Sequence, residues 1–115
     1  MLAKRLRFHG HGSLRFLYKN ADAFRSKYFT LKAMTHPRRT TSRFSVIVSK
    51  KVHKSAVGRN RIRRRMYEII RQDLTVLNGS YDIAIIITSG EVLAADYSEM
   101  QKTYRELLHQ AGIVQ

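Results

Sequence analysis

Apolar residues recur with helical spacing in the middle of the chain. Ile62 is followed by Met66, Ile69 and Ile70, at spacings of four, seven and eight residues. Because an α-helix has about 3.6 residues per turn, these side chains form a stripe along one side of it. The spacing predicts an amphipathic helix over residues 55–74.

Two further helices are predicted in the same way. Residues 13–20 favour a short helix capped by Ser13. Its expected packed side consists of Leu14, Leu17 and Tyr18. The last helix is expected to begin at Asp96, because Glu99 three residues later completes a capping-box pattern. Its expected core stripe consists of Tyr97, Met100, Tyr104, Leu107, Leu108 and Ala111.

Three segments have the pattern of β-strands. Alternating apolar and polar residues predict strands over residues 28–34 and 43–49. The run of isoleucines within residues 81–88 predicts a strand that is buried on both faces. We expect the first two strands to pair as a hairpin and residues 22–27 to form a loop.

The predicted order of elements is α-β-β-α-β-α, with room for a further short strand. This order indicates an α+β fold, a single-domain sandwich of helices on a small sheet. The 115 residues are enough for one core, and residues 1–115 are therefore expected to form one domain. Residues 1–12 are expected to be a flexible basic segment. Gly58 lies four residues before Ile62, on the packed side of its helix, where it allows a close approach.

Positive charge is concentrated in the first two-thirds of the chain. The net charge is +14. Residues 1–71 hold 20 of the 22 Lys and Arg against two acids, which gives +18, and residues 72–115 hold two against six acids, which gives −4. This balance indicates a polyanionic partner that binds the first two-thirds.

Arginine covers the outer side of the helix predicted over residues 55–74. The basic residues are Arg59, Arg61, Arg63, Arg64, Arg65 and Arg71, and Glu68 is the single acid. A solvated helix face normally mixes charges of both signs. Arginines at this density repel one another unless a polyanion is present, and the guanidinium group matches phosphate oxygens. The helix is therefore predicted to bind a nucleic-acid backbone.

The sequence Ser49-Lys50-Lys51, followed by Arg59-Asn60-Arg61-Ile62-Arg63-Arg64, resembles the bacterial ribonuclease P protein component. The resemblance extends from about residue 6 to the end of the last helix. It implies an accessory subunit of a catalytic RNA, which itself carries the active site and the Mg²⁺ ions. It also implies endonucleolytic cleavage of precursor tRNA at the 5′ end, and a left-handed strand-helix-strand crossover, against the usual rule.

The resemblance implies two groups of RNA-binding residues. The catalytic RNA is expected to contact Lys50, Asn60, Arg61, Arg64 and Arg65. The single-stranded 5′ leader of precursor tRNA is expected in a cleft between the first helix and the sheet, lined by Leu14, Tyr18, Lys32, Ser49, Lys51, Arg59 and Arg63. A basic groove with a stacking platform suits a single strand.

The chain departs from the family pattern at four positions. Leu14 and Lys32 stand where the family often has aromatic residues, Tyr67 where it often has arginine, and Ala21 where it often has glycine. The first two changes weaken base stacking and add charge. They leave the sequence preference within the leader open.

The sequence bears on three other functions. A protein-only nuclease is disfavoured, because the five histidines and the nearby acids show no catalytic or metal-ligand spacing. A ribosomal protein or a general RNA chaperone without leader specificity has a similar composition and stays the alternative. A membrane binder would need an apolar face beside its basic one. With no cysteine and no membrane-length apolar run, we expect a cytoplasmic protein that binds neither membrane nor DNA.

Overall fold

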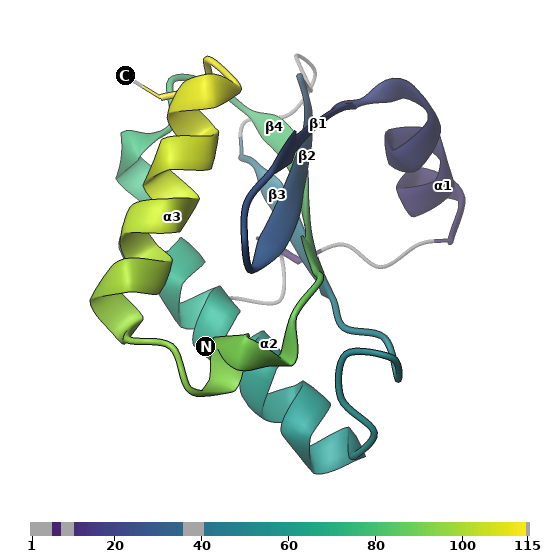
Figure 1. The fold of residues 1–115 in the computed structure, drawn as a ribbon. Coiled ribbons are helices and arrows are strands. Elements are labelled where there is room, and N and C mark those ends of the chain that lie inside the picture. The colour runs from purple at the N-terminus through teal and green to yellow at the C-terminus, as the bar shows by residue number, and fades with distance from the viewer. Residues whose placement is uncertain (1–5, 8–10, 36–40, 115) are drawn as a thin grey trace.

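A computed structural model describes residues 6–7, 11–35 and 41–114, and Figure 1 shows its ribbon. The described elements follow the order α1 (His11–Asn20), β1 (Asp22–Arg25), β2 (Phe29–Thr35), β3 (Arg43–Ile47), α2 (Ala56–Gln72), β4 (Tyr81–Ile87) and α3 (Tyr97–Gln110). Two 3-10 turns, η2 (Leu74–Val76) and η3 (Gly90–Leu93), flank β4. The expected α+β class is confirmed.

The four strands form one sheet in the order β1-β2-β4-β3. β2 pairs antiparallel with β1 and β4, whereas β3 pairs parallel with β4. The predicted hairpin of β2 and β3 is therefore wrong. Strand β4 lies between β2 and β3 in the sheet, and its residues Ile83, Ala84 and Ile85 are all fully buried. Helix α2 forms the crossover from β3 to β4, and the handedness of that crossover stays a prediction.

Strand β1 was predicted to be a loop, and this prediction is wrong. Its ends, Asp22 and Arg25, are exposed, and only Ala23 and Phe24 are apolar, so its alternation is too short to recognise. Pairing with β2 decides the structure instead, through a tight turn in which the hydroxyl of Ser26 donates to the Phe29 carbonyl at 2.7 Å. Local pattern is a weak guide for such an edge strand.

The two faces of the sheet are covered by different helices (Figure 1). Helices α2 and α3 cover one face, where both predicted apolar stripes enter the main core. Helix α1 covers part of the other face, where Leu17 packs against Ala84 with only a few half-buried neighbours. Burial of a large apolar side chain contributes roughly 1.5–3 kcal/mol, so the main core supplies most of the stability.

Helix ends match the sequence in one case and differ in another. Ser55 caps α2, and its hydroxyl accepts from the Gly58 N–H at 3.2 Å. Asp96 precedes α3 as expected, but the capping box does not form. The Asp96 carboxylate accepts from the Ser98 hydroxyl, and the Glu99 carboxylate accepts from the Tyr28 hydroxyl at 2.9 Å. A tyrosine from distant sequence thus competes successfully for the capping glutamate.

The segment expected to be a flexible N-terminus lies partly outside the described residues, which omit 1–5 and 8–10. The described part is docked on the fold. Leu6 is buried in the core, and Arg7 forms a parallel bridge with Phe44 at the outer edge of β3. His11 and Gly12 already belong to α1.

Candidate nucleic-acid interface

The outward side of α2 presents Asn60, Arg61 and Arg64, all of which are exposed. The buried residues Ile62, Met66, Ile69 and Ile70 fix this orientation by holding the opposite side of the helix in the core. Neither Arg61 nor Arg64 has a hydrogen-bond or ion-pair partner among the residues that the structure describes. Their guanidinium groups are therefore available to an external anion.

The other four arginines of α2, which are Arg59, Arg63, Arg65 and Arg71, already hold partners within the fold. Arg63 donates to the Asn60 side-chain oxygen at 2.9 Å. Arg65 donates to the carbonyls of Leu93 at 3.0 Å and of Ala95, in the segment between β4 and α3. Arg65 was expected to bind RNA, and the structure places at least two of its donors against the protein's own backbone. Spacing along one helix does not reveal partners about 30 residues away.

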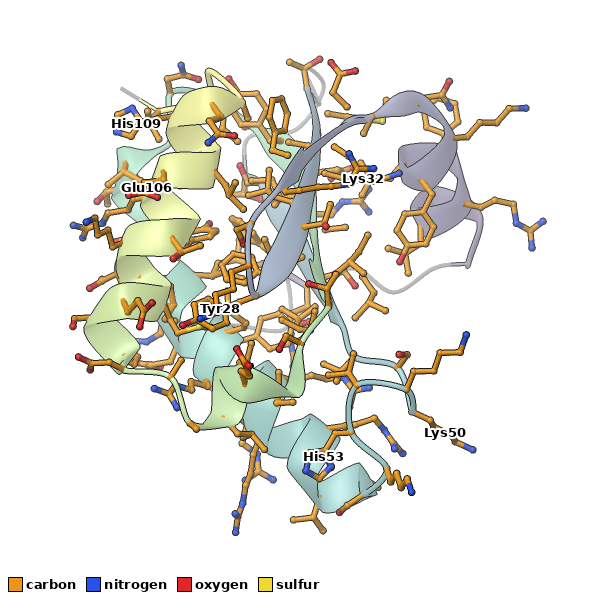
Figure 2. All side chains as sticks on the ribbon, in the orientation of Figure 1. Tyr28, Lys32, Lys50, His53, Glu106 and His109 are labelled. Atoms are coloured by element: carbon orange, nitrogen blue, oxygen red, sulfur yellow. The ribbon has the colours of Figure 1, made fainter. Side chains whose placement is uncertain are left out.

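Arg59, expected at the edge of the leader cleft, closes the loop that precedes α2. One of its terminal nitrogens donates to the carbonyls of His53 and Lys54, at 2.9 Å each. The loop carries Lys50 and Lys51, which are both exposed. Figure 2 shows Lys50 and His53 on this connection beside the start of α2. Arg59 thus has a structural role that sequence reasoning missed.

The sheet face beneath α1 is lined by cross-strand rows of side chains. One row contains Lys32 of β2, Ala84 of β4 and Ser45 of β3. The next row, Thr30, Ile86 and Ile47, is half-buried. Ala84 and Ser45 are buried, whereas Lys32 and the second row are half-buried, so only this part of the face is accessible to a ligand.

Tyr18 and Lys32 meet between α1 and β2. The Lys32 ammonium donates to the Tyr18 carbonyl at 2.9 Å and lies 5.5 Å from the centre of the Tyr18 ring. The ring itself is 38% exposed, and partial burial raises the pKa of its hydroxyl. Leu14, one turn earlier, is half-buried against Leu17 and Ala84. The structure therefore brings together an aromatic ring and a cation from the predicted leader group. Figure 2 labels Lys32 beside α1.

Tyr67 has a role that the sequence did not indicate. Its hydroxyl accepts from the Val46 N–H at 3.2 Å, on the outer edge of β3. Burial raises its pKa, and the nearby charges of Arg7 and Arg63 oppose that shift. The Arg7 guanidinium lies 6.0 Å from the ring centre. Tyr67 thus satisfies an edge-strand donor and gathers two cations around it.

The remaining surface shows no catalytic arrangement in the part of the chain that the structure describes. No group of three or more His, Asp or Glu there could hold a metal ion. His53 is bonded within its loop, His109 is exposed on α3, and His9 and His36 lie outside the described residues. No described helix is both long and apolar enough to cross a membrane.

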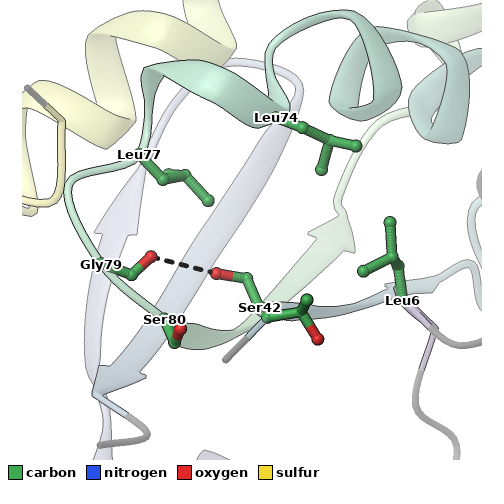
Figure 3. A pocket seen from close by; sticks show the side chains of 7 residues that line it. Leu6, Ser42, Leu74, Leu77, Gly79 and Ser80 are labelled. Atoms are coloured by element: carbon green, nitrogen blue, oxygen red, sulfur yellow. Dashed lines mark hydrogen bonds between the residues drawn. The ribbon is translucent and has the colours of Figure 1, made fainter. Parts of the chain in front are cut away.

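A hollow of about 270 Å³ opens at the end of the sheet that lies below η2 (Figure 3). It is lined by Leu6, Thr41, Ser42, Leu74, Leu77, Gly79 and Ser80. The Ser42 hydroxyl donates to the Gly79 carbonyl and accepts from the Tyr81 N–H, so it is occupied in fixing the turn. The lining contains no acid, base or cation, and we do not consider it an active site.

The fold and this surface define a class, the small α+β proteins that carry one exposed basic helix face. The chain belongs to the ribonuclease P family, whose model matches residues 2–112. The ribonuclease P protein component of Pseudanabaena sp. (strain PCC 6903) is 32% identical over 98 residues, which cover 85% of this chain and 84% of that protein. The protein component from Chloroflexus aurantiacus is 40% identical over 77 residues, covering 67% of this chain and 56% of that protein.

Solved structures share the fold. The ribonuclease P protein of Staphylococcus aureus superposes with a TM-score of 0.82 at 20% identity, covering 96% of this chain and 98% of that one. The protein from Thermotoga maritima gives a TM-score of 0.79 at 20% identity, covering 90% and 96%. The chain is therefore a protein component of a ribonuclease holoenzyme, in which its partner is the ribonuclease P RNA.

Proposed function

We propose that the protein uses two surfaces in that holoenzyme. The outward side of α2, with Arg61 and Arg64, binds the catalytic RNA. The region between α1 and the sheet, with Tyr18 and Lys32, binds the single-stranded 5′ leader of precursor tRNA. The observation that carries the proposal is the pair of exposed arginines without partners among the described residues, on a helix otherwise fixed in the core.

Electrostatics support the surface for the catalytic RNA. Each cation that neutralises a phosphate releases a condensed counterion, so binding weakens as salt concentration rises. Asn60, Arg61 and Arg64 extend from a rigid helix, and Lys50 is exposed on the adjoining loop. Because the helix holds their backbone in place, these side chains lose less conformational entropy when they bind RNA. Arg65 is expected to contribute through the backbone carbonyls that it holds rather than through a free guanidinium.

Stacking and charge support the leader surface. Bases of any sequence stack on an aromatic ring, which gives affinity without strong sequence preference. The Lys32 ammonium, fixed by the Tyr18 carbonyl, places one positive charge beside that ring. The proposed leader surface continues toward the start of α2, where it includes Ser49, Lys51, Arg59 and Arg63. The half-buried row of Thr30, Ile86 and Ile47 supplies the floor.

The catalytic chemistry is assigned to the RNA in this proposal. The RNA holds the Mg²⁺ ions and cleaves precursor tRNA, whereas the protein binds, orients and screens phosphate repulsion between the two RNAs. The protein chain is not expected to be catalytic, to bind a metal alone, or to bind DNA. The expected cytoplasmic location stays part of the proposal.

A cleavage assay at limiting Mg²⁺ tests this function, with the RNA alone, the protein alone and both together. We expect no cleavage by the protein alone and faster cleavage by the mixture than by the RNA alone. Metal-dependent cleavage by RNA-free protein would overturn the division of roles. Equal stimulation with precursors that have and lack a leader would instead indicate a general RNA chaperone.

A further inference from the structure

We infer that His53 is a positioning residue for RNA binding, which fixes the lysine loop, residues 49–54, against the start of α2. This inference rests on the proposed function, because it concerns how Lys50 and Lys51 reach the RNA. The contacts of His53 are with Ser55, Gly58 and Arg59, which are described in turn.

The His53 ring is held from two sides. Its Nδ1 atom accepts from the Ser55 N–H at 3.2 Å. The ring also lies against the bare Cα of Gly58, where an added Cβ would come within 2.1 Å of Cε1 and 2.3 Å of Nδ1. Real Cβ atoms are never found so close, so only glycine at position 58 allows this contact. The close approach predicted for Gly58 is thus made by an imidazole ring.

The backbone of the lysine loop is held at three further points. The Ser49 carbonyl accepts from the N–H groups of Val52 at 3.1 Å and His53 at 3.3 Å, which makes a turn around Lys50 and Lys51. Arg59 reaches back from α2 to the His53 carbonyl. An added Cβ on Gly90 would lie 3.0 Å from the Val52 carbonyl, so the start of η3 also lies close against the loop.

This loop needs such constraints because its charges oppose order. Lys50, Lys51 and Lys54 are exposed, and no acid lies within residues 49–67. Mutual repulsion favours an extended, mobile loop. A loop held in place before binding loses less conformational entropy when the RNA arrives. The His53 contacts therefore act on RNA affinity through Lys50 and Lys51.

Gly58→Ala is the most informative variant. The added methyl group displaces a side chain and not backbone, and alanine favours helix more than glycine does. We expect an unchanged or higher melting temperature together with weaker binding of the catalytic RNA, by on the order of fivefold. Gly79→Ala is the matched control, because the nearest atoms to its added Cβ lie at 3.5 Å, and its RNA affinity should not change.

His53 variants separate the hydrogen bond from packing. His53→Ala should weaken RNA binding as Gly58→Ala does. His53→Asn keeps an acceptor near the position of Nδ1 and should restore most of the lost affinity. If His53 acted through packing alone, His53→Asn would not restore RNA affinity, and both variants would lower the melting temperature.

A double-mutant cycle with Lys50→Ala, the loop lysine assigned to the catalytic RNA, gives the decisive comparison. In the wild-type background this change should reduce the salt slope of RNA binding by about 1. In the Gly58→Ala background we expect less than half of that effect, because the lysine is no longer positioned. Equal effects in both backgrounds, or none in the wild type, would overturn the inference. Failure of the proposed function looks different, since the wild-type protein itself would then not bind the catalytic RNA.

Discussion

The two faces of the sheet are built from the same four strands but carry different side chains. The face under α2 and α3 presents Phe29, Leu31, Phe44, Ile83 and Ile85, each fully buried. The face under α1 presents Lys32, Ser45 and Ala84 in one row, with Leu17 as its only fully covered large residue. The first face is closed by apolar packing, whereas the second keeps half-buried side chains at Lys32 and in the row of Thr30, Ile86 and Ile47. Stability and leader binding are therefore assigned to opposite faces of the sheet, and the variants below test that assignment.

Ile85→Ala should have the largest effect. The residue is fully buried at the centre of the closed face, and removing a large side chain there typically costs about 2–5 kcal/mol of unfolding free energy. Urea denaturation measures this loss. RNA affinity per folded molecule should stay close to wild type. A large loss of affinity in molecules that remain folded would show that the closed face also takes part in binding.

Tyr18→Ala is the corresponding change on the open face. Stacking of a base on one aromatic ring is worth about 1–3 kcal/mol, and the holoenzyme should lose that much affinity for precursor tRNA. Mature tRNA lacks the leader, so its affinity should barely change. Lys32→Ala should cost less, because a single exposed cation is screened by salt. If Tyr18→Ala weakens precursor and mature tRNA equally, the ring only supports α1 and the leader cleft is wrong.

Helix α2 joins the two functions, because its inner side closes the core and its outer side is basic. Arg61→Ala and Arg64→Ala should leave the melting temperature unchanged. Each should weaken binding of the catalytic RNA by on the order of 1 kcal/mol and reduce the salt slope by about 1. Titrations at several salt concentrations measure both quantities. An unchanged affinity and slope in the double variant would move the RNA surface elsewhere.

The sequence predicted elements with long, regular patterns and failed where distant contacts decide the structure. The stripe of Ile62, Met66, Ile69 and Ile70 placed α2 correctly, and Asn60 and Arg64 are exposed on the side opposite to it. Strand β1 was missed because four residues carry too little pattern, and pairing with β2 selects its structure. The order of strands was missed because alternation within β3 does not show which strand lies beside it.

The candidate site divides in the same way. The exposure of Arg61 and Arg64 follows from their angular positions around the helix axis, so helical spacing was enough to predict it. The partners of Arg65 lie 28 and 30 residues away, and no local pattern encodes them. The fit of His53 on Gly58 depends on how a loop folds back onto a helix. In the sequence, only the glycine at position 58 indicated that another group approaches the helix closely there.

Glu68 offers the smallest and most specific test, because it is the one acid among the arginines of α2. Arg71 donates to its carboxylate, with Nε 3.1 Å from Oε2, and this hydrogen bond lowers the pKa of Glu68 to about 2. The pKa of Glu68 in the unfolded protein is about 4.3, so the ion pair stabilises the folded protein at pH values above about 4.3. This stabilisation decreases as the pH falls toward 2. Both groups are exposed, so the effect should be small.

Glu68→Gln should therefore lower the melting temperature slightly at pH 7 and not at pH 2. At pH 7 it should also strengthen binding of the catalytic RNA, because it removes the only negative charge on that helix. Thermal denaturation across this pH range and RNA titration at fixed salt measure the two effects, which have opposite signs. If Glu68→Gln lowered both the stability and the RNA affinity, the Glu68–Arg71 pair would be needed to orient the basic side of α2. The assignment of RNA binding to its free arginines would then have to include that pair.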